Sequence, residues 1–311
     1  MALSPEISII VPTYNRLSEL QTAVASILAQ TVSRPVELIV VDDNSGDGTW
    51  DWLSRCMSEH PAVTLIRAPR NGGPGSARNL ALKVATGRYF IPIDSDFILI
   101  DGAIDRILAA IRDHGKYHLL FFPCLQSPGM RRLDSFRDSC EVNRESFLTN
   151  AVGELIPVTD LYYLRSRNLS YPALRGGGEG ILWARMLEGG PALFLNSPIV
   201  LYRTDVKGRI CTLDYQMNNP AALAEVSDAL LELYASDGGR ALRGVRRTKL
   251  RASGTYHLLA GNSSVGRRRL VSAAVYGDAM ALATLAASLG GTRLFRWLFR
   301  YYRTRLRPAY L

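Results

Sequence analysis

Two aspartates one residue apart, Asp94 and Asp96, are the residues of this sequence most suited to chemistry. They follow a short apolar run, Tyr89 to Ile93, which is typical of a strand buried on both faces of a parallel sheet. Carboxylates at the carboxyl end of such a strand lie where open α/β sheets bind ligands. Hard cations such as Mg²⁺ and Mn²⁺ prefer oxygen ligands and are commonly shared with substrate phosphates. The pair therefore indicates either a metal and phosphate site or a turn that caps the next helix.

The first hundred residues alternate between strand and helix patterns. Strands are expected at 7–11, 36–41, 63–67 and 89–93, and helices at 17–30, 50–60 and 77–85. Strands and helices joined by short connections predict a doubly wound α/β fold with a parallel sheet. The loops after the strands then converge at one edge, which brings Thr13, Asp43, Arg78 and Asp94 together. Four converging polar loops predict a binding site.

Each of these loops carries groups suited to a nucleotide. Asp43 can accept a hydrogen bond from a base or a ribose hydroxyl, or it can cap the following helix. Tyr14 can stack on a base, or it can pack at the sheet edge. The glycines of 71–79 permit close backbone approach, and Arg78 supplies a fork of donors suited to a diphosphate. The sequence has neither G-x-G-x-x-G after its first strand nor G-x-x-x-x-G-K-[ST], so a dinucleotide site and a P-loop are not supported.

Four motifs, in this order and with these gaps, resemble the family 2 glycosyltransferases of the GT-A fold. They are IIVPTYNR at 9–16, VVDDNS at 40–45, the loop from Asn71 to Asn79, and Asp94-Ser95-Asp96. The resemblance covers roughly residues 5–210. It implies a GT-A type, mostly parallel sheet and a metal-assisted, inverting transfer. The donor is expected to be a nucleotide sugar, most simply a UDP-sugar, and the acceptor a hydroxyl of a glycan or lipid-linked saccharide.

The resemblance also implies roles for single residues. The residues expected to bind the nucleotide sugar are Pro12, Thr13, Tyr14, Arg16, Asp43, Gly72, Arg78, Asn79, Asp94 and Ser95. Within this set, Thr13 and Tyr14 match the loop that contacts the base, and Asp43 matches the contact to uracil or ribose. Asp96 is expected to bind Mg²⁺ or Mn²⁺ directly. Asp205 stands where relatives often have a metal-proximal His, so it is a further candidate oxygen ligand.

The glycine run before Trp183 resembles a family segment, Gly-Glu-Asp, at the head of a helix. With Trp183 as the anchor, Glu179 falls on the family's Asp and is the expected general base. An inverting transfer needs such a carboxylate opposite the leaving diphosphate. The alternative is an acid that only stabilises the first turn of the helix. Because the Glu-Asp pair is missing, a catalytically inactive, nucleotide-binding scaffold in a membrane-associated assembly also stays open.

The net charge of +9 is unevenly distributed along the chain. Residues 216–311 hold 15 basic and 5 acidic residues, which gives them a charge of +10 and leaves −1 for residues 1–215. We therefore expect a GT-A catalytic domain at 1–215 and a basic helical region at 216–311. Helices are expected at 219–235, 242–261 and 271–289. The last is rich in apolar residues, but Asp278 interrupts it, so we expect a buried helix and not a membrane span.

The last expected helix, 292–307, combines an apolar stripe with a basic one. Leu294, Trp297 and Tyr301 recur on one face and arginines on another, which is typical of a helix at an anionic membrane surface. The alternative is that the apolar face docks on the protein or on a second copy of the chain, as in a homodimer. Nucleic acid is not an expected partner, because the arginines alternate with a wide apolar face.

Cysteine usage and the first residues indicate the compartment. The four cysteines are far apart and are not clustered with the four histidines, so neither a zinc site nor a disulfide framework is expected. Residues 1–5 lead straight into a strand pattern without the basic and apolar regions of a signal peptide. We expect a cytoplasmic protein, held peripherally at the inner face of the cell membrane if its last helix binds lipid.

Overall fold

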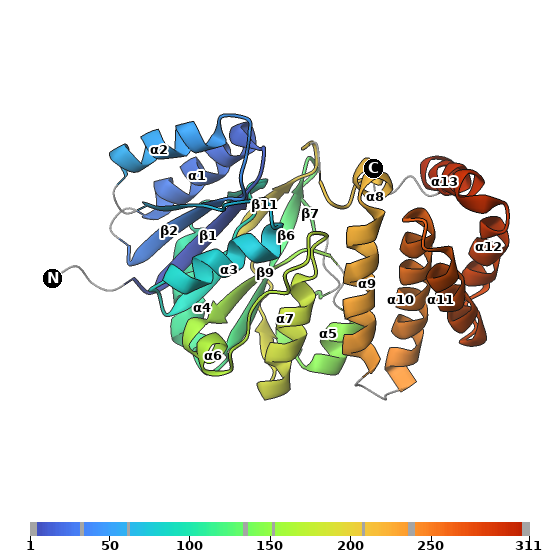
Figure 1. Cartoon of the computed structure of the whole chain (residues 1–311). Helices are drawn as coiled ribbons and strands as arrows, with labels where there is room; N and C mark the ends of the chain where they lie inside the picture. Colours follow the sequence, from blue (N-terminus) through green and yellow to red (C-terminus); the bar gives the residue numbers. More distant parts are fainter. Residues whose placement is uncertain are drawn as a thin grey trace. The chain divides into compact units, whose positions relative to one another are not determined.

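The computed structural model describes residues 5–31, 34–60, 63–132, 136–150, 153–206, 209–235 and 240–306. Contacts along the backbone group the chain into two compact units. The first unit comprises Met1–Ala173 and Leu182–Val206, and the second comprises Leu174–Ile181 and Lys207–Leu311. Figure 1 shows an α/β arrangement for the first unit and helices for the second.

The first unit begins with the expected alternation of strands and helices. Its elements are β1 (Ile7–Thr13), α1 (Leu17–Thr31), β2 (Val36–Asp42), α2 (Thr49–Glu59), β3 (Val63–Arg67), α3 (Pro74–Val84) and β4 (Tyr89–Pro92). The predicted strands and helices of this region are confirmed within a few residues at their ends. Helix α3 begins at Pro74, before the predicted Ala77, because proline suits a first helical turn that needs no backbone donor.

The chain from Phe97 to Arg203 is less regular. It contains β5 (Phe97–Leu99), α4 (Ala103–His114), β6 (Leu119–Ser127), β7 (Arg131–Arg132), β8 (Cys140–Val142), α5 (Arg144–Asn150), β9 (Leu155–Asp160), α6 (Leu161–Ser166), α7 (Glu179–Met186), a 3-10 turn (Leu187–Gly189), β10 (Ala192–Phe194) and β11 (Val200–Arg203). The apolar pattern from Phe194 to Val200 predicts one strand, and this prediction is wrong. Phe194 ends β10 and Val200 begins β11, and Pro198 between them has no N–H to donate to a sheet.

Hydrogen bonds order the main strands β3-β2-β1-β4-β9-β6-β10-β8. β1 is parallel to both β2 and β4, so that Ile9 lies opposite Leu38 on one side and Ile91 on the other. β9 runs antiparallel to β4 and β6. β11 pairs in parallel with β6 and antiparallel with β5. The sheet is therefore mixed but mostly parallel, as the GT-A interpretation predicts.

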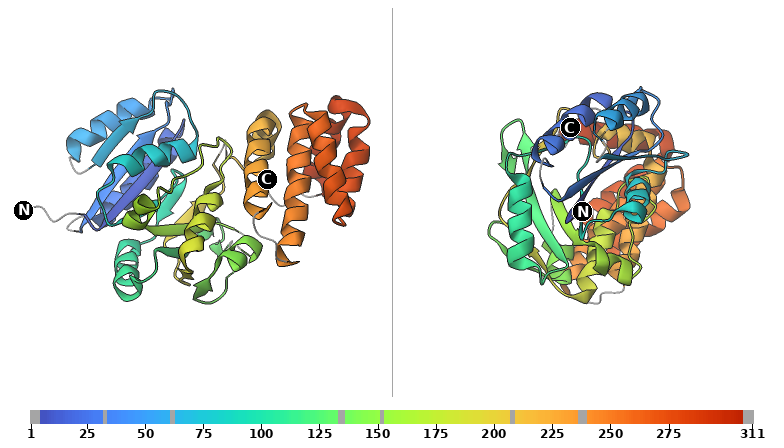
Figure 2. Two further views of the ribbon diagram at one scale, coloured as in Figure 1. Left: turned by 60° about the horizontal axis from the view of Figure 1, so that its bottom comes forward. Right: turned by 90° about the vertical axis from the view of Figure 1, so that its left-hand side faces the viewer.

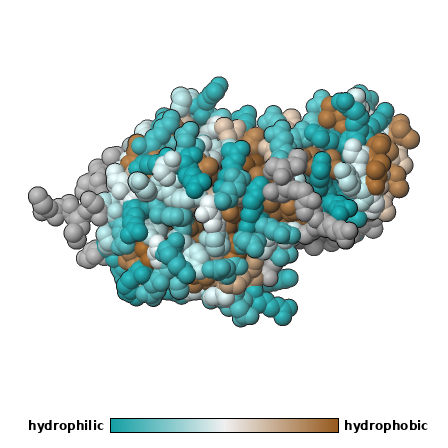
Figure 3. Space-filling view, turned by 90° about the horizontal axis from the view of Figure 1, so that it is seen from below, coloured by the Kyte–Doolittle hydropathy of each residue, from teal (hydrophilic) through white to brown (hydrophobic). Residues whose placement is uncertain are grey.

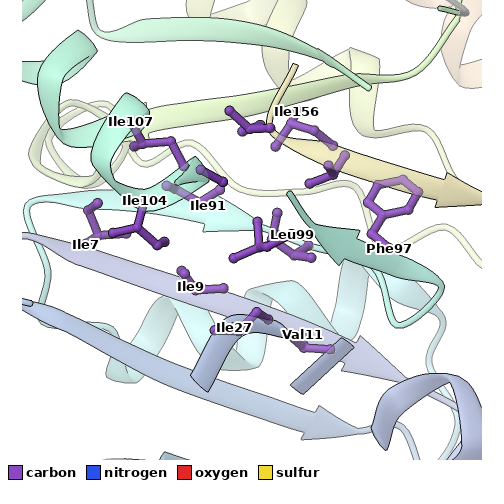
Figure 4. Close-up of a cluster of buried hydrophobic side chains, with 14 of the residues drawn as sticks. Ile7, Ile9, Val11, Ile27, Ile91, Phe97, Leu99, Ile104, Ile107 and Ile156 are labelled. Carbon is purple, nitrogen blue, oxygen red and sulfur yellow. The ribbon is translucent and has the colours of Figure 1, made fainter. Parts of the chain in front are cut away.

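Helices cover the parallel strands on both sides (Figure 2). Every residue of β1 is buried, because α3 packs against β1 and β2 while α1, α2 and α4 share a core with the same strands. Figure 4 shows part of this core, where Ile27 of α1 lies near Ile9 and Val11 of β1, and Ile104 of α4 lies near Ile7. The packed core fixes the strand ends, and these ends carry the polar loops.

The second unit is helical. It contains α8 (Leu213–Asn218), α9 (Pro220–Ala235), α10 (Arg240–Leu259), α11 (Ser263–Val275), α12 (Ala279–Ser288), α13 (Gly291–Tyr301) and a π-helical turn (Tyr302–Leu306). Helices α9 to α13 contact one another in chain order. Their shared core includes Leu231, Leu258, Leu270, Ala281 and Phe295.

One predicted helix of this unit is wrong. The segment expected to be one helix at 271–289 is divided between α11 and α12. Gly277 has a φ of +84°, and the Asp278 carboxylate accepts a hydrogen bond of 3.1 Å from the Ala281 N–H, which caps α12. None of the helices in the described ranges is long and apolar enough to cross a bilayer. Arg307, the last residue of the expected terminal helix, lies outside those ranges.

Candidate active site

The loops after β1, β2 and β4 begin side by side because these strands are neighbours in register. Thr13 lies opposite Asp42 across β1 and β2, and the Asp43 N–H donates to the Thr13 carbonyl at 2.8 Å. The Ile93 N–H donates to the Ile10 carbonyl at 2.8 Å, which continues the β1–β4 pairing to the start of the Asp94 loop. The predicted convergence of the polar loops is therefore a direct result of parallel register.

Asp43 joins the end of β2 to the glycine loop before α3. Its Oδ1 accepts from the Gly72 N–H at 2.9 Å and its Oδ2 from the Gly73 N–H at 2.7 Å. This loop requires glycine, because a Cβ on Gly72 would lie 2.8 Å from the Cβ of Ser76 and because Gly73 has a φ of +85°. A carboxylate has about four acceptor positions. Asp43 thus binds the glycine loop through both of its carboxylate oxygens.

Two arginines lie against the two aspartates of the Asp94–Asp96 loop. Arg78, which is buried, donates from Nη2 to Asp94 Oδ1 at 2.5 Å. Arg16 donates from Nη1 to Asp96 Oδ2 at 3.0 Å. The Asp96 side chain is 7% exposed and that of Asp94 is 41% exposed. Each carboxylate thus has a cationic neighbour, and the cluster combines two aspartates with two arginines at one edge of the sheet.

Arg78 is held from its other side by the segment around Tyr171. Its guanidinium carbon lies 5.4 Å from the centre of the Tyr171 ring, in cation–π range. The Asn79 amide donates to the Tyr171 carbonyl at 2.8 Å, and the Asn79 amide oxygen accepts from the Tyr171 N–H at 2.9 Å. Asn79, which is expected beside the diphosphate, therefore binds the backbone of Tyr171 in this structure.

Four further predicted residues lie at this edge, two at the end of β1 and two in the loops. Thr13 is buried, and its hydroxyl has no hydrogen-bond partner among the residues that the structure describes. Tyr14, the next residue, is 45% exposed. Pro12 is buried in β1, and Ser95 is buried between the two aspartates. A buried hydroxyl without a partner next to an exposed aromatic ring is suited to a ligand that both stacks and accepts or donates a hydrogen bond.

Asp205 follows β11, which pairs with β5 beside the Asp94–Asp96 loop. The Arg203 N–H donates to the Asp96 carbonyl at 3.2 Å, while the Arg203 guanidinium donates to both oxygens of Asp205, at 3.2 and 2.9 Å. This hydrogen bonding lowers the pKa of Asp205 and raises the pKa of Arg203. Arg203, which the sequence did not single out, thus adds a cation near Asp96.

Glu179 lies outside the loops that the strand register brings together. It is the first residue of α7 and belongs to the segment Leu174–Ile181, which groups with the second unit. Gly177 and Gly178 before it have φ values of +99° and +101°, so the chain turns sharply into the helix. A Cβ on Gly177 would lie 3.4 Å from Glu179 Oε2. Glu179 therefore occupies the first turn of a helix, a position that both interpretations of this residue share.

The residues at the sheet edge fit a hard divalent cation on donor chemistry. Asp94 and Asp96 offer carboxylate oxygens, the type of ligand that Mg²⁺ and Mn²⁺ prefer. Among the described residues, no three or more His, Cys, Asp and Glu side chains gather into a complete metal site. A cation bound here would therefore take its remaining ligands from substrate phosphates and water, which is the usual mode for Mg²⁺.

Two residues that support the site were missed by sequence reasoning. Tyr171 lies far along the chain from Arg78, and no spacing pattern relates them. Asn15 has a φ of +49°; its N–H donates to the Ser45 hydroxyl at 2.9 Å, and its side-chain oxygen accepts from the Gly46 N–H at 2.8 Å. The preference of Asn for left-handed backbone could have suggested this tie between the first two loops.

Comparison with known proteins identifies the class to which this fold and site belong. Residues 8–138 match the family model described as Glycosyl transferase family 2, and this range contains every motif of the sheet edge. Residues 8–138 therefore form a domain of glycosyltransferase family 2, and the chain is similar to named glycosyltransferases and to structures of the GT-A fold.

Two relatives are named glycan-synthesis proteins. The chain is 28% identical over 268 residues to the succinoglycan biosynthesis protein ExoO of Rhizobium meliloti, covering 79% of this chain and 75% of that protein. It is 38% identical over 90 residues to the Escherichia coli UDP-Glc:alpha-D-GlcNAc-diphosphoundecaprenol beta-1,3-glucosyltransferase WfaP, covering 29% of this chain and 35% of the relative. The match to a poly(ribitol-phosphate) beta-glucosyltransferase of Bacillus spizizenii covers 15% of that protein. The chain thus matches less than half the length of several relatives.

Solved structures are similar in fold over almost the whole chain. TarS residues 1–349 of S. aureus, in complex with UDP-GlcNAc, match with a TM-score of 0.62 at 18% identity, covering 96% of this chain and 92% of that one. The mannosyltransferase PcManGT of Pyrobaculum calidifontis, in complex with GDP-Man and Mn²⁺, matches with a TM-score of 0.56 at 22% identity, covering 99% of this chain and 85% of that one. At these identities the likeness is one of fold.

Proposed function

We propose that this protein is an inverting glycosyltransferase that moves a sugar from a nucleotide sugar to a hydroxyl of a glycan or lipid-linked saccharide. The observation that carries the proposal is the hydrogen-bonded cluster of Asp43, Arg78 and the Asp94–Asp96 loop at the edge of a family 2 domain. Glucosyl transfer to an undecaprenol-linked sugar and succinoglycan biosynthesis, the functions named for two relatives, support a glycan or lipid-linked acceptor. In this proposal residues 1–215 are the catalytic domain and residues 216–311 a separate helical region.

The nucleotide of the donor is proposed to be UDP. WfaP is named for UDP-Glc, and TarS has been solved with UDP-GlcNAc, which supports this choice. The Thr13 hydroxyl and the exposed Tyr14 ring are suited to hydrogen bonding and stacking with a base. Asp43, which also has acceptor positions for a base or ribose, is the third contact of this part of the donor.

Arg16 and Arg78 are proposed to bind the diphosphate. A guanidinium carries several N–H donors in a planar fork that matches phosphate oxygens, and both arginines lie beside the Asp94–Asp96 loop. When the donor binds, these cations would offset the charge that develops on the leaving diphosphate. Their present contacts to Asp96 and Asp94 hold them close to where that charge would form.

Asp96, with Asp94 beside it, is proposed to hold Mg²⁺ or Mn²⁺. A bound divalent cation would supply further positive charge to the diphosphate. The Mn²⁺ complex of PcManGT, which has a similar fold, supports this choice of ion. Asp205 is proposed as an additional oxygen ligand. It follows Arg203 by two residues, and the Arg203 N–H donates a hydrogen bond to the Asp96 carbonyl.

Glu179 is proposed as the general base. In the reaction, the acceptor oxygen forms a bond to the anomeric carbon while the bond from that carbon to the diphosphate oxygen breaks. The acceptor proton passes to the Glu179 carboxylate, the bond electrons leave with the nucleoside diphosphate, and the anomeric configuration inverts. A product that retains the donor's configuration would contradict this role.

Thermal unfolding in the presence of nucleotides tests the binding site. A ligand that binds only the folded chain raises the midpoint by mass action. We expect UDP to raise it more than GDP or dTDP, and more with Mn²⁺ than without. A shift with GDP or dTDP alone would change the donor and keep the site. Binding of UDP without transfer or donor hydrolysis, over a broad set of acceptors, would instead support a nucleotide-binding scaffold without catalysis.

Asp96→Ala tests the metal assignment. We expect the variant to lose the Mn²⁺-dependent part of the UDP shift and to transfer sugar at least about a hundredfold more slowly, in line with the loss of one preorganised charge contact. Glu232→Ala, an exposed acid of α9, is the matched control and should behave as the wild type. Wild-type turnover by the Asp96 variant with Mn²⁺ present would show that the assignment is wrong.

A further inference from the structure

Helix α13 uses one of its faces to complete the core of the second unit. Phe295 is 3% exposed, and Phe299 packs against the same cluster. Arg296, on this side of the helix, donates to the Leu259 carbonyl at 2.9 Å and to the Met217 carbonyl at 2.7 Å. One apolar face of this helix is thus docked on its own unit. This docking fixes which side of α13 points outward.

The opposite face of α13 is apolar and exposed. Leu294, Trp297 and Tyr301, three and four residues apart, share this face and are 46%, 60% and 51% exposed. The Trp297 and Tyr301 rings stack, with centroids 5.8 Å apart. Leu289, 71% exposed, precedes them at the turn, where the Leu294 side chain lies across Gly290. We name Leu289, Leu294, Trp297 and Tyr301 the outer row.

The surroundings of the outer row are basic and contain no acid of the same segment. Arg293 and Arg300 lie about one turn before and after Trp297, on its flank, and both are exposed. Arg303 and Arg305 follow in the π-helical turn. The sequence has no Asp or Glu from residue 279 to its last residue. Figure 3 shows that hydrophobic side chains also gather on the surface at α12, which contacts α13.

We propose that the outer row and its arginines form a membrane-contacting surface that binds an anionic bilayer at the level of its head groups. Exposed Trp and Tyr rings favour the interface between lipid and water, and arginines beside them attract anionic lipids. The helix lies along the surface of its unit and does not meet the length and apolarity needed for a span. This inference goes beyond the proposed reaction and does not depend on it.

Charge favours lipid over a second copy of the chain as the occupant of this surface. A twofold interface places a patch against the same patch of its partner. Here that arrangement would bring Arg293 and Arg300 towards their own copies. Residues 279–306 hold no acid to pair with them, and Asp214 of α8 already lies 3.9 Å from Arg300 within the same copy. Like charges facing each other disfavour association. Phospholipid head groups with net negative charge have the opposite effect.

Co-sedimentation of the full chain with vesicles tests the proposal. We expect binding to phosphatidylcholine vesicles that contain about one third phosphatidylglycerol, much weaker binding to phosphatidylcholine alone, and partial release by salt because surface charge is screened. Truncation before Thr292 is not a suitable variant, because it removes Phe295 from the core. Point substitutions on the outer face avoid this problem.

Two double variants and two matched controls separate the contributions. Leu294→Ser with Trp297→Ser removes apolar area, and Arg293→Gln with Arg300→Gln removes charge; each should weaken binding to anionic vesicles by about tenfold or more. Tyr162→Ser (80% exposed) and Arg112→Gln (75% exposed side chain) change similar residues of the first unit and should bind as the wild type. All four should keep the thermal midpoint and the UDP-induced shift, so that loss of lipid binding is distinct from failure of the transferase proposal.

Four results would overturn the membrane assignment. The first is no binding of the wild type to anionic vesicles. The second is vesicle binding that the controls and the outer-row variants lose equally. The third is a dimer in light scattering that the Leu294 and Trp297 substitutions dissociate, since the outer row would then be an interface between copies. Tighter binding to single-stranded RNA than to vesicles, abolished by the same substitutions, would likewise replace the lipid proposal.

Discussion

At the scale of single residues, the candidate site is positioned by side chains that bond to backbone groups. Asp43 accepts from two successive N–H groups of the glycine loop, and Asn79 both donates to and accepts from Tyr171. Tyr171 in turn lies under Arg78, which holds Asp94. The position of Asp94 therefore depends on Asn79, which bonds Tyr171 and acts on Asp94 only through Tyr171 and Arg78.

Asn79→Ala tests this positioning chain. It leaves the N–H and the carbonyl of Tyr171, a buried residue, without their partner, so we expect the free energy of unfolding to fall by about 1–3 kcal/mol. The affinity for UDP should fall as well, because Arg78 loses its fixed support. Chemical denaturation and nucleotide titration measure the two effects. Asn218→Ala, at an exposed position of α8, is the control and should change neither.

The motifs were sufficient to predict the acids and arginines of the site but not their pairing. The sequence placed Asp43, Arg78, Asp94 and Asp96 in neighbouring loops, because parallel strands end at one edge. It could not reveal that Arg16 bonds Asp96 across 80 residues, or that Asn79 faces Tyr171 across 92. Such contacts depend on side-chain directions that only the packed sheet and helices determine.

At the scale of elements, two glycines allow α10 and α11 to approach each other closely. A Cβ on Gly254 would lie 2.9 Å from the Gly266 carbonyl oxygen, and a Cβ on Gly266 would lie 2.9 Å from the Gly254 carbonyl oxygen. Backbone cannot move aside as a flexible side chain can. The close crossing of these helices therefore needs hydrogen at both positions.

Gly254→Ala and Gly244→Ala should have opposite effects on stability although both lie in α10. The first inserts a methyl group against backbone and should cost about 1–3 kcal/mol of unfolding free energy. The second has no atom within 4 Å of its Cβ position and should gain up to about 1 kcal/mol, since alanine is the better helix former. Urea denaturation measures both. Equal changes for the two variants would mean that helix propensity, not the crossing, controls position 254.

A partly buried carboxylate also joins these helices. Asp228 of α9 accepts from the Ser253 hydroxyl at 2.6 Å and lies 2.8 Å from His257 Nε2, both on α10, and 3.3 Å from Arg269 Nη2 on α11. Burial alone would raise the pKa of Asp228, but these hydrogen bonds and charges outweigh it and hold the pKa below its ordinary value. The ionised form is thus the one that stabilises the packing of the three helices.

The contribution of Asp228 should depend on pH. Because the pKa is lower in the folded chain than in the unfolded one, the stabilisation is complete above the ordinary Asp range and is lost as the pH falls through the folded pKa. We expect Asp228→Asn to lower the unfolding free energy by about 1–3 kcal/mol near neutral pH and by less in acid. Denaturation at several pH values checks this. A difference that grows on acidification would contradict the direction of the shift, and Glu232→Gln on the exposed side of α9 is the control.

At the scale of the whole molecule, the two units differ in charge and in chemistry. The proposed donor site lies wholly in the first unit, whereas the basic excess and the outer row lie in the second. Ligands of one unit should therefore leave the internal packing of the other unchanged.

Hydrogen exchange can test this separation. With Mn²⁺ and UDP at about a hundred times its Kd, binding stabilises the first unit by about 2.7 kcal/mol. We expect slower exchange in the loops at 13–16, 43–47, 71–79 and 94–97, and unchanged exchange in α10 and α11. Slower exchange confined to α10 and α11 would show that the nucleotide binds the second unit, which would contradict the proposed site. The same experiment on Asp96→Ala should show a smaller effect in the loops.

The sequence by itself determined the family, the mostly parallel sheet and the four loops that meet at its edge. This was possible because strand and helix periodicity, glycine positions and motif spacing are local properties of the chain. Only the tertiary structure decided how charges pair at that edge, that residues 271–289 form two helices, and which face of α13 is buried. Both faces of α13 carry apolar residues in the sequence. They differ in exposure because Phe295 packs into the core of the second unit, whereas Trp297 lies on the outer side of the helix.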